Sequence, residues 1–276
     1  MPQTDINASA RRRVLVQGDA DLGAFAQMAP PFVPEVLSQA DLLHAVRSAP
    51  PSAVILVEPF IGATLSPEPW VRDLAVAAPL VPIVACTPFR PAHMPGITTL
   101  LAWGVTDIAD VEFEATSAAI RQRLLDTHAK PFKRRLEQRL SRRVSQNGLT
   151  LLRAAAAVAV DGGTSVGLAS AVGCSDRTVP GWCAREGLPS PRRLLAWMRA
   201  LLAVALLEER HRSIVQVAHC AGFASDHPLR RALRELLGGD VPPRDRTFAG
   251  AMELLNAELR DLRNRARRRS PVGRVA

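Results

Sequence analysis

A set of arginines near residue 230 has the spacing of one exposed helix face. Leu229, Leu233 and Leu236 recur at helical spacing, which predicts a helix that buries these leucines. An arginine on the opposite face can donate two hydrogen bonds to the O6 and N7 atoms of a guanine. The polar residues expected on that outer face are His227, Arg230, Arg231 and Arg234. The pattern therefore indicates a helix that contacts nucleic acid.

A second helix is expected directly before this one. Ser213 is a suitable N-cap, because its hydroxyl can accept from a free backbone N–H, and the other free N–H groups there are expected to meet a phosphate. Gly222 ends that helix with the left-handed backbone that a sharp corner needs. Ser225 or Asp226 caps the next helix, and Asp226 could instead accept a hydrogen bond from cytosine, although we favour the cap. Gly238 and Gly239 end the pair.

Residues 213–246 resemble the second helix-turn-helix of AraC/XylS-type transcription activators, with one residue inserted at the glycine pair. The matching positions are Ile214, Val217, Ala218, Gly222, Phe223, Arg231, Leu236, Leu237, Pro242 and Arg246. Residues 164–187 resemble the first helix-turn-helix of that family, and residues 191–209 match the helix that joins the two modules. The matching positions of the first module are Leu168, Ala169, Gly173, Ser175, Val179 and Trp182. The resemblance implies an all-helical DNA-binding domain.

The first module departs from the family pattern at the positions that face the bases. Pro180 is expected about five residues into the helix, where it removes a backbone hydrogen bond. Gly181 and Ala184 offer no polar side chain. Base contacts by this module are therefore expected from Arg177, with Thr178 as a second candidate. Because one bidentate contact is worth about 1–3 kcal/mol, most of the specificity should belong to the second module. The arginines expected to contact phosphates or to be solvated, not to read bases, are Arg192, Arg193, Arg210, Arg212 and Arg234.

Residues 1–128 alternate short apolar runs with helical stretches, which predicts five βα units in a doubly wound parallel sheet. The predicted strands cover residues 13–16, 33–37, 53–57, 81–85 and 105–108, and the predicted helices cover residues 22–29, 39–48, 68–77, 97–103 and 115–128. The order resembles the receiver domain of response regulators, although another flavodoxin-like domain also fits it.

A receiver domain needs an aspartate that accepts a phosphoryl group, acidic ligands for Mg²⁺, a threonine and a lysine. Here Glu58 stands at the acceptor position and Asp19 is the one acid after the first strand. Thr87 is at the threonine position, whereas residues 107–112 contain no lysine. We expect a degenerate domain that works without phosphorylation. Glu58 either mimics a charged acceptor or is a solvated loop carboxylate, and we favour the second.

The charge distribution supports this division of the chain. Residues 1–128 carry 8 Arg and Lys against 13 Asp and Glu, whereas residues 129–276 carry 27 against 13. An acidic half joined to a basic half is typical of a DNA-binding domain attached to a control domain. No uncharged apolar run reaches 18 residues, so no membrane span is expected. No glycine-rich phosphate loop and no cofactor or metal site is predicted.

We divide the chain into a receiver-like α/β domain (residues 1–128), a connector helix (129–148), a double helix-turn-helix domain (149–246) and a C-terminal helix with a basic tail (247–276). The expected fold class is α/β plus all-α. A helix within the last segment is predicted over residues 248–269, and one within the connector over residues 130–144. A break is predicted at residues 145–148, followed by an alanine-rich helix over residues 149–160. The four scattered cysteines favour a reducing cytoplasm.

These features predict a sequence-specific transcription regulator, not an enzyme, that binds double-stranded DNA as a homodimer, with RNA polymerase as a further candidate partner and no membrane association. Two alternatives stay open. The first is a non-catalytic interaction protein whose helix-turn-helix modules have lost DNA binding. The second, less favoured, is a DNA-repair alkyl acceptor, which would need a reactive cysteine cluster. The cysteines are Cys86, Cys174, Cys183 and Cys220.

Overall fold

The computed structural model describes residues 12–18, 32–62, 64–113, 116–239 and 241–269 of the 276-residue chain. The chain divides into two compact units, Met1–Pro131 and Phe132–Ala276. Asp19 and the helix predicted over residues 22–29 lie outside the described residues. None of the described helices combines the length and the apolar character that crossing a bilayer requires.

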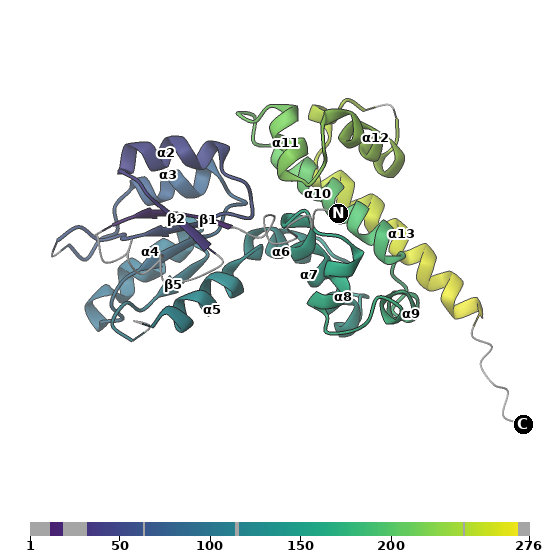
Figure 1. The fold of residues 1–276 in the computed structure, drawn as a ribbon, viewed down its shortest axis with the longest axis horizontal. Coiled ribbons are helices and arrows are strands. Elements are labelled where there is room, and N and C mark those ends of the chain that lie inside the picture. Colours follow the sequence, from purple (N-terminus) through teal and green to yellow (C-terminus); the bar gives the residue numbers. More distant parts are fainter. Residues whose placement is uncertain (1–11, 19–31, 63, 114–115, 240, 270–276) are drawn as a thin grey trace, which may run out of the picture. The chain divides into compact units, whose positions relative to one another are not determined.

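The first unit is built on a five-stranded parallel sheet with the strand order β2-β1-β3-β4-β5 (Figure 1). The strands are β1 (Arg12–Gln17), β2 (Phe32–Val36), β3 (Val54–Val57), β4 (Ile83–Cys86) and β5 (Asp107–Ala109). In register, Leu15 lies opposite Ile55, and Ile55 lies opposite Ile83. Pro34 is tolerated because β2 is an edge strand, where a missing N–H breaks no ladder. The predicted parallel α/β sheet is confirmed.

Helices cover both faces of this sheet, because side chains alternate between the two faces along each strand. The helices are α2 (Gln39–Ser48), α3 (Trp70–Ala77), α4 (Met94–Trp103), which follows the short η2 turn (Pro91–His93), and α5 (Ser117–Thr127). Leu15 and Ile55 pack in one apolar core with side chains of α2, α3 and α4. Val14 and Val84 pack in the other core with side chains of α5. Strands β3 and β4 are therefore buried along their whole length.

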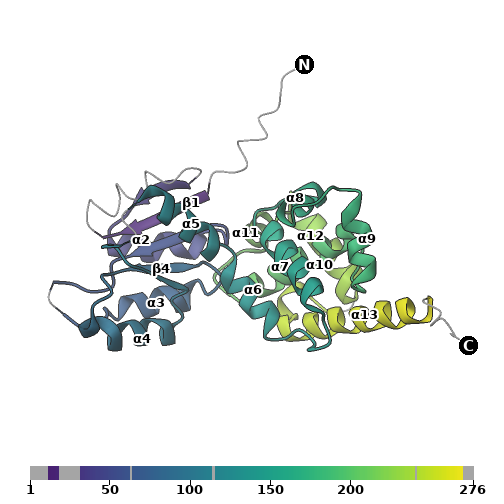
Figure 2. The ribbon, with the colours of Figure 1, turned by 90° about the horizontal axis from the view of Figure 1, so that it is seen from below.

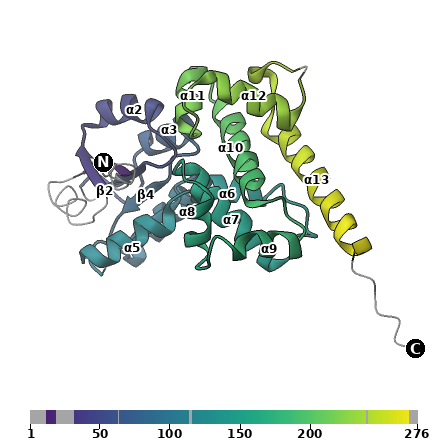
Figure 3. The ribbon, with the colours of Figure 1, turned by 45° about the vertical axis from the view of Figure 1, so that its right-hand side comes forward.

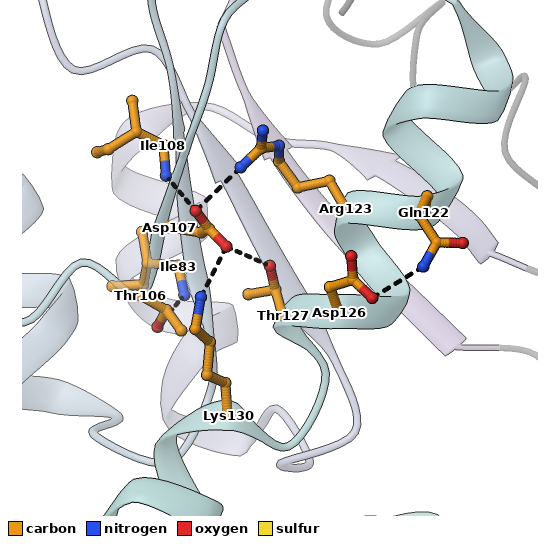
Figure 4. Close-up of polar contacts among 9 residues, drawn as sticks. All are labelled: Ile83, Thr106, Asp107, Ile108, Gln122, Arg123, Asp126, Thr127 and Lys130. Carbon is orange, nitrogen blue, oxygen red and sulfur yellow. Dashed lines mark hydrogen bonds and ion pairs between the residues drawn. The ribbon is translucent and has the colours of Figure 1, made fainter. Parts of the chain in front are cut away.

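Asp107, the first residue of β5, ties the end of this unit to the sheet (Figure 4). Its Oδ1 accepts from Arg123 at 3.0 Å and from the Ile108 backbone N–H at 2.9 Å. Its Oδ2 accepts from Lys130 Nζ at 2.8 Å and from the Thr127 hydroxyl at 3.3 Å. Burial opposes ionisation of this carboxyl, but Lys130, the Ile108 N–H and Arg123 outweigh burial and lower its pKa below the ordinary 3.8.

The second unit contains helices only, among its described residues. They are α6, which begins at the end of the first unit (Lys130–Glu137), α7 (Gln146–Val160), α8 (Ser165–Ala171), α9 (Thr178–Arg185), α10 (Pro191–Leu207), α11 (Ile214–Cys220), α12 (Asp226–Leu237), η3 (Pro243–Asp245) and α13 (Phe248–Arg269). Thirteen of the 17 residues of α10 are buried, so this helix is the centre of the unit. Helices α8 and α9 lie toward one end of α10, and α11 and α12 toward the other (Figure 3).

The ends of two helices differ from the prediction. Helix α6 stops at Glu137, not at residue 144, because residues 138–144 form turns. The break predicted at residues 145–148 is in fact the start of α7, where the Ser145 hydroxyl caps the helix by accepting from the Gly148 N–H at 3.0 Å. Helix α13 has the predicted bounds, and its far end extends past the other helices of this unit (Figure 2).

We predict that Asp107→Asn lowers the free energy of unfolding by roughly 1–3 kcal/mol near neutral pH, because charge-assisted hydrogen bonds are lost. The folded-state pKa of Asp107 is below its unfolded value, so its contribution is full above the unfolded pKa and disappears as the pH falls through the folded pKa. The difference between wild type and variant should therefore shrink below about pH 4.

Urea denaturation followed by circular dichroism over a pH series measures this difference. Asp126→Asn is the matched control, because Asp126 is exposed and accepts one bond, from Gln122 on the same helix. A loss for Asp107→Asn that stays constant from neutral to strongly acidic pH would contradict the assigned role of the ionised carboxylate.

Candidate nucleic-acid interface

Helix α12 is strongly amphipathic, and its polar face carries the residues predicted from the sequence. Leu229 and Leu233 are buried as predicted, Leu237 is also buried, and Leu236, which was assigned to the inward face, is half-buried. The buried leucines of α12 are therefore those at i, i+4 and i+8. The exposed side chains on the outer face are His227, Arg230, Arg231 and Arg234.

Two of these arginines hold acidic partners on the same helix. Arg230 Nε donates to Asp226 Oδ2 at 3.1 Å, and Arg231 Nε donates to Glu235 Oε1 at 2.7 Å. The predicted cap role of Asp226 is wrong, because Ser225 occupies the N-cap position and Asp226 is the first helical residue. Exposed pairs one turn apart contribute little to stability, so another acceptor can replace either carboxylate at small cost.

Helix α11 begins with a complete capping box. The Ser213 hydroxyl accepts from the Gln216 N–H at 3.2 Å, and the Gln216 side chain accepts from the Ser213 N–H at 2.8 Å. The predicted N-cap is confirmed. Because these two N–H groups already have acceptors, they are not open to a phosphate. Ser213 is exposed, and its contact with DNA remains a prediction.

The outer face of helix α9 carries fewer long side chains than the outer face of α12. Arg177 is at the N-cap position and Thr178 is the first helical residue, and both are exposed. Pro180 is the third residue of the helix and not the fifth, so it falls in the first turn, where the N–H groups have no acceptor within the helix. The expected disruption by Pro180 is therefore wrong. Gly181 is exposed, and a Cβ added there would have no atom within 4 Å.

Two further arginines, Arg212 and Arg246, are in the interior of the unit. Arg246 is 7% exposed and donates through Nη1 to the Leu237 carbonyl at 3.0 Å and through Nη2 to the Gly238 carbonyl. It thus satisfies carbonyls at the end of α12. Arg212 was predicted as a phosphate contact or solvated charge, which is wrong, because it is 2% exposed and paired with Glu209.

The remaining arginines assigned to phosphate contact differ in whether a carboxylate already holds the guanidinium group. Arg193 holds both carboxylate oxygens of Glu258 on α13, at 2.6 and 2.8 Å. Burial opposes ionisation of Glu258, but its bonds from Arg193 and Trp197 lower its pKa below the ordinary value. Arg192 and Arg210 are exposed, so they stay compatible with a phosphate contact.

Glycines with left-handed backbone form the corners between the helices of each pair. Gly173 follows α8 with φ 67°, and Gly222 follows α11 with φ 75°. A Cβ on Gly222 would lie 3.0 Å from Gly162 Cα, at the end of α7. Arg199 of α10 donates to the Gly162 and Gly163 carbonyls at 3.1 and 2.6 Å. The corner between α11 and α12 therefore packs directly on the end of α7, because neither glycine has a side chain.

Burial affects the thiols of two cysteines of this unit, Cys183 and Cys220. Burial raises the pKa of the Cys183 thiol to about 11, and burial also raises the pKa of Cys220. The thiolate is the reactive form of cysteine, so raised pKa values disfavour attack on an alkyl group. Within the part of the chain that the structure describes, no three His, Cys, Asp or Glu side chains gather as metal ligands would. Neither observation favours an alkyl acceptor.

The carboxyl edge of the sheet in the first unit carries the residues considered for phosphorylation. Glu58 follows β3 and is half-buried, and Thr87 follows β4 and is 2% exposed. The buried Asp110 follows β5, where a receiver domain has its lysine. The residues described at this edge therefore offer an acidic set without the lysine that would bind a transferred phosphoryl group.

Comparison of the chain with protein-family models, with curated proteins and with solved structures found no match.

We predict that Gly222→Ala lowers the free energy of unfolding by about 1–3 kcal/mol, because alanine is strained at positive φ and its Cβ would press on the backbone of Gly162. The matched control is Gly181→Ala, in open space on a helix, which should raise stability by about 0.5–1 kcal/mol. Urea denaturation followed by circular dichroism compares both with wild type. Equal effects of the two substitutions would refute the close packing of the corner on α7.

Proposed function

We propose that this chain is a sequence-specific transcription regulator of the AraC/XylS type, in which the second unit binds double-stranded DNA. The observation that carries the proposal is the outer face of α12, where four basic side chains are exposed on a helix that follows a left-handed glycine corner. A second pair, α8 and α9, with its own glycine corner, precedes the buried helix α10. Two such pairs are expected to present helices to successive segments of a major groove.

The electrostatics agree with this proposal. Residues 129–276 contain 27 basic and 13 acidic residues. The resulting positive net charge attracts a polyanion. Arg231 has the most exposed side chain of the two paired arginines, at 71% against 46% for Arg230. A side chain that protrudes from the middle of the outer face can reach base edges at the floor of the groove. We therefore assign base recognition chiefly to Arg231.

The first unit is proposed to dimerise or to control the second, without phosphorylation, and the regulator is proposed to act as a homodimer on DNA with RNA polymerase as its further partner. The acidic carboxyl edge of the sheet, with Glu58 and Asp110 and no following lysine, supports a role that does not depend on phosphoryl transfer.

A second candidate is an interaction protein that does not bind DNA. The observation in its favour is the outer face of α9, where Pro180, Gly181 and Ala184 offer no group that reads a base. Fluorescence anisotropy with a random duplex at about 50 mM salt distinguishes the two, because non-specific binding to DNA is strongest at low salt. Binding that weakens steeply as salt rises supports the regulator, and no binding supports the interaction protein.

We predict that Arg231→Ala changes base preference at one or two neighbouring positions of the site and weakens binding about tenfold or more, since an arginine that binds a guanine supplies much of the discrimination there. Selection of bound sequences from a random DNA pool, repeated with the variant, measures the preference. Arg210→Ala is the control, because Arg210 is exposed but lies outside α12, and it should leave the selected sequence unchanged. An identical motif from wild type and Arg231→Ala would refute the assigned role.

A further inference from the structure

A cleft of about 430 Å³ lies beside α12, and four of the nine residues that line it are histidine or arginine. One wall is the helix itself, with His227, Arg230 and Arg234 at i, i+3 and i+7, so that the three share one stripe. The other wall includes Pro242 and Pro243, which have no N–H to donate. A polar group in the cleft would therefore be recognised chiefly by the histidine and the arginines.

Arg246 supplies a fixed positive charge to the lining of this cleft. Its guanidinium is bonded to two carbonyls at the end of α12, and it forms no ion pair with any carboxylate among the described residues. The carboxyl end of a helix carries roughly half a negative charge, which offsets only part of one guanidinium. Nε of Arg246 is buried and has no acceptor among the described residues. Since a buried charge favours a counter-ion, the cleft is suited to an anion.

The other basic groups are available to such an anion. Arg234 and His227 are exposed and have no hydrogen-bond or ion-pair partner among the described residues. Arg230 is held through Nε by Asp226, which leaves its two terminal nitrogens as donors. Arg231 does not line the cleft and is bonded to Glu235 instead. The basic residues of α12 thus divide into three that line the cleft and one, Arg231, that does not.

We propose that the cleft binds a phosphate of the DNA backbone, with Arg230 and Arg234 donating to its oxygens. This inference rests on the proposed function and assigns different tasks to neighbouring arginines. Guanidinium groups match phosphate oxygens with paired hydrogen bonds, and phosphates are the most exposed part of a duplex, so the arginines that line a cleft beside the helix can meet them. The phosphate fixes the register of α12, and Arg231 reads sequence from that position.

The test combines a charge-removing variant with a neutral backbone. Arg234→Gln should weaken binding of the selected and of a random duplex by the same factor, and should reduce the slope of log K against log salt by about 1. In a set of duplexes that each carry one methylphosphonate, one position should weaken wild-type binding by a similar factor. That same position should cause no further loss in Arg234→Gln, because the two changes remove one interaction.

Arg231→Gln is the matched control on the same helix. It should alter base preference and remain fully sensitive to that methylphosphonate. Circular dichroism and thermal melting check that each variant is folded, which is expected because both side chains are exposed. A changed base preference in Arg234→Gln, or independent effects of Arg234→Gln and every methylphosphonate, would overturn the phosphate assignment while leaving DNA binding intact.

A free phosphate or phosphorylated small molecule has the same chemistry, so a second arm tests that source. Inorganic phosphate, titrated at constant ionic strength against a labelled duplex, should not displace the DNA. Displacement by phosphate that is lost in Arg234→Gln would assign the cleft to a small anion and overturn the backbone contact. Failure of the wild-type protein to bind any duplex would reject both the proposed function and this inference, and is thus distinct from failure of the inference alone.

Discussion

The second unit depends on the burial of α10. Leu201, Leu202 and Val204 are 0% exposed on different sides of this helix, so no side of its carboxyl-terminal half faces water. A helix that is apolar all round must be enclosed by other elements. Each large apolar side chain buried here contributes about 1.5–3 kcal/mol relative to exposure. Helix α7 packs against α10, and small residues such as Ala155 and Ala159 are among the buried side chains of α7.

Enclosing α10 determines which side of each surrounding helix faces solvent. Helix α12 uses its leucine stripe for this packing, so its arginines have to face outward. The last backbone carbonyls of a helix have no donor within the helix. Where such an end lies near the core, water cannot reach these carbonyls, so a side chain has to donate to them. Arg246 and Arg199 supply those donors from within the unit, at the ends of α12 and α7. The arginines of this unit therefore fall into two classes. Some donate hydrogen bonds to backbone carbonyls in the interior, and others face solvent.

Local signals predicted most of the elements but not their tertiary partners. Helix α2 has the predicted bounds because Ser38 caps its start and the apolar residues recur at helical spacing. The start of α7 was missed because Gly148 was interpreted as part of a break, although Ser145 is a good capping residue. Pro180 was misplaced within α9 because the first residue of a helix depends on the preceding turn. The burial of Arg246 had no periodic signal, since its acceptors precede it by eight and nine residues.

The contrast between α9 and α12 has a consequence for how such a regulator would obtain specificity. Under the proposed function, α9 can approach the DNA backbone closely, since Gly181 and Ala184 do not hold it away, but it offers the bases few donors. Its affinity would then come from charge, which any sequence satisfies. A single reading helix contacts only a few base pairs, and each of them supplies about 1–3 kcal/mol of discrimination. That is too little to select one site among many in a genome, so two copies of α12 on paired half-sites are needed, which is a physical reason for the proposed homodimer.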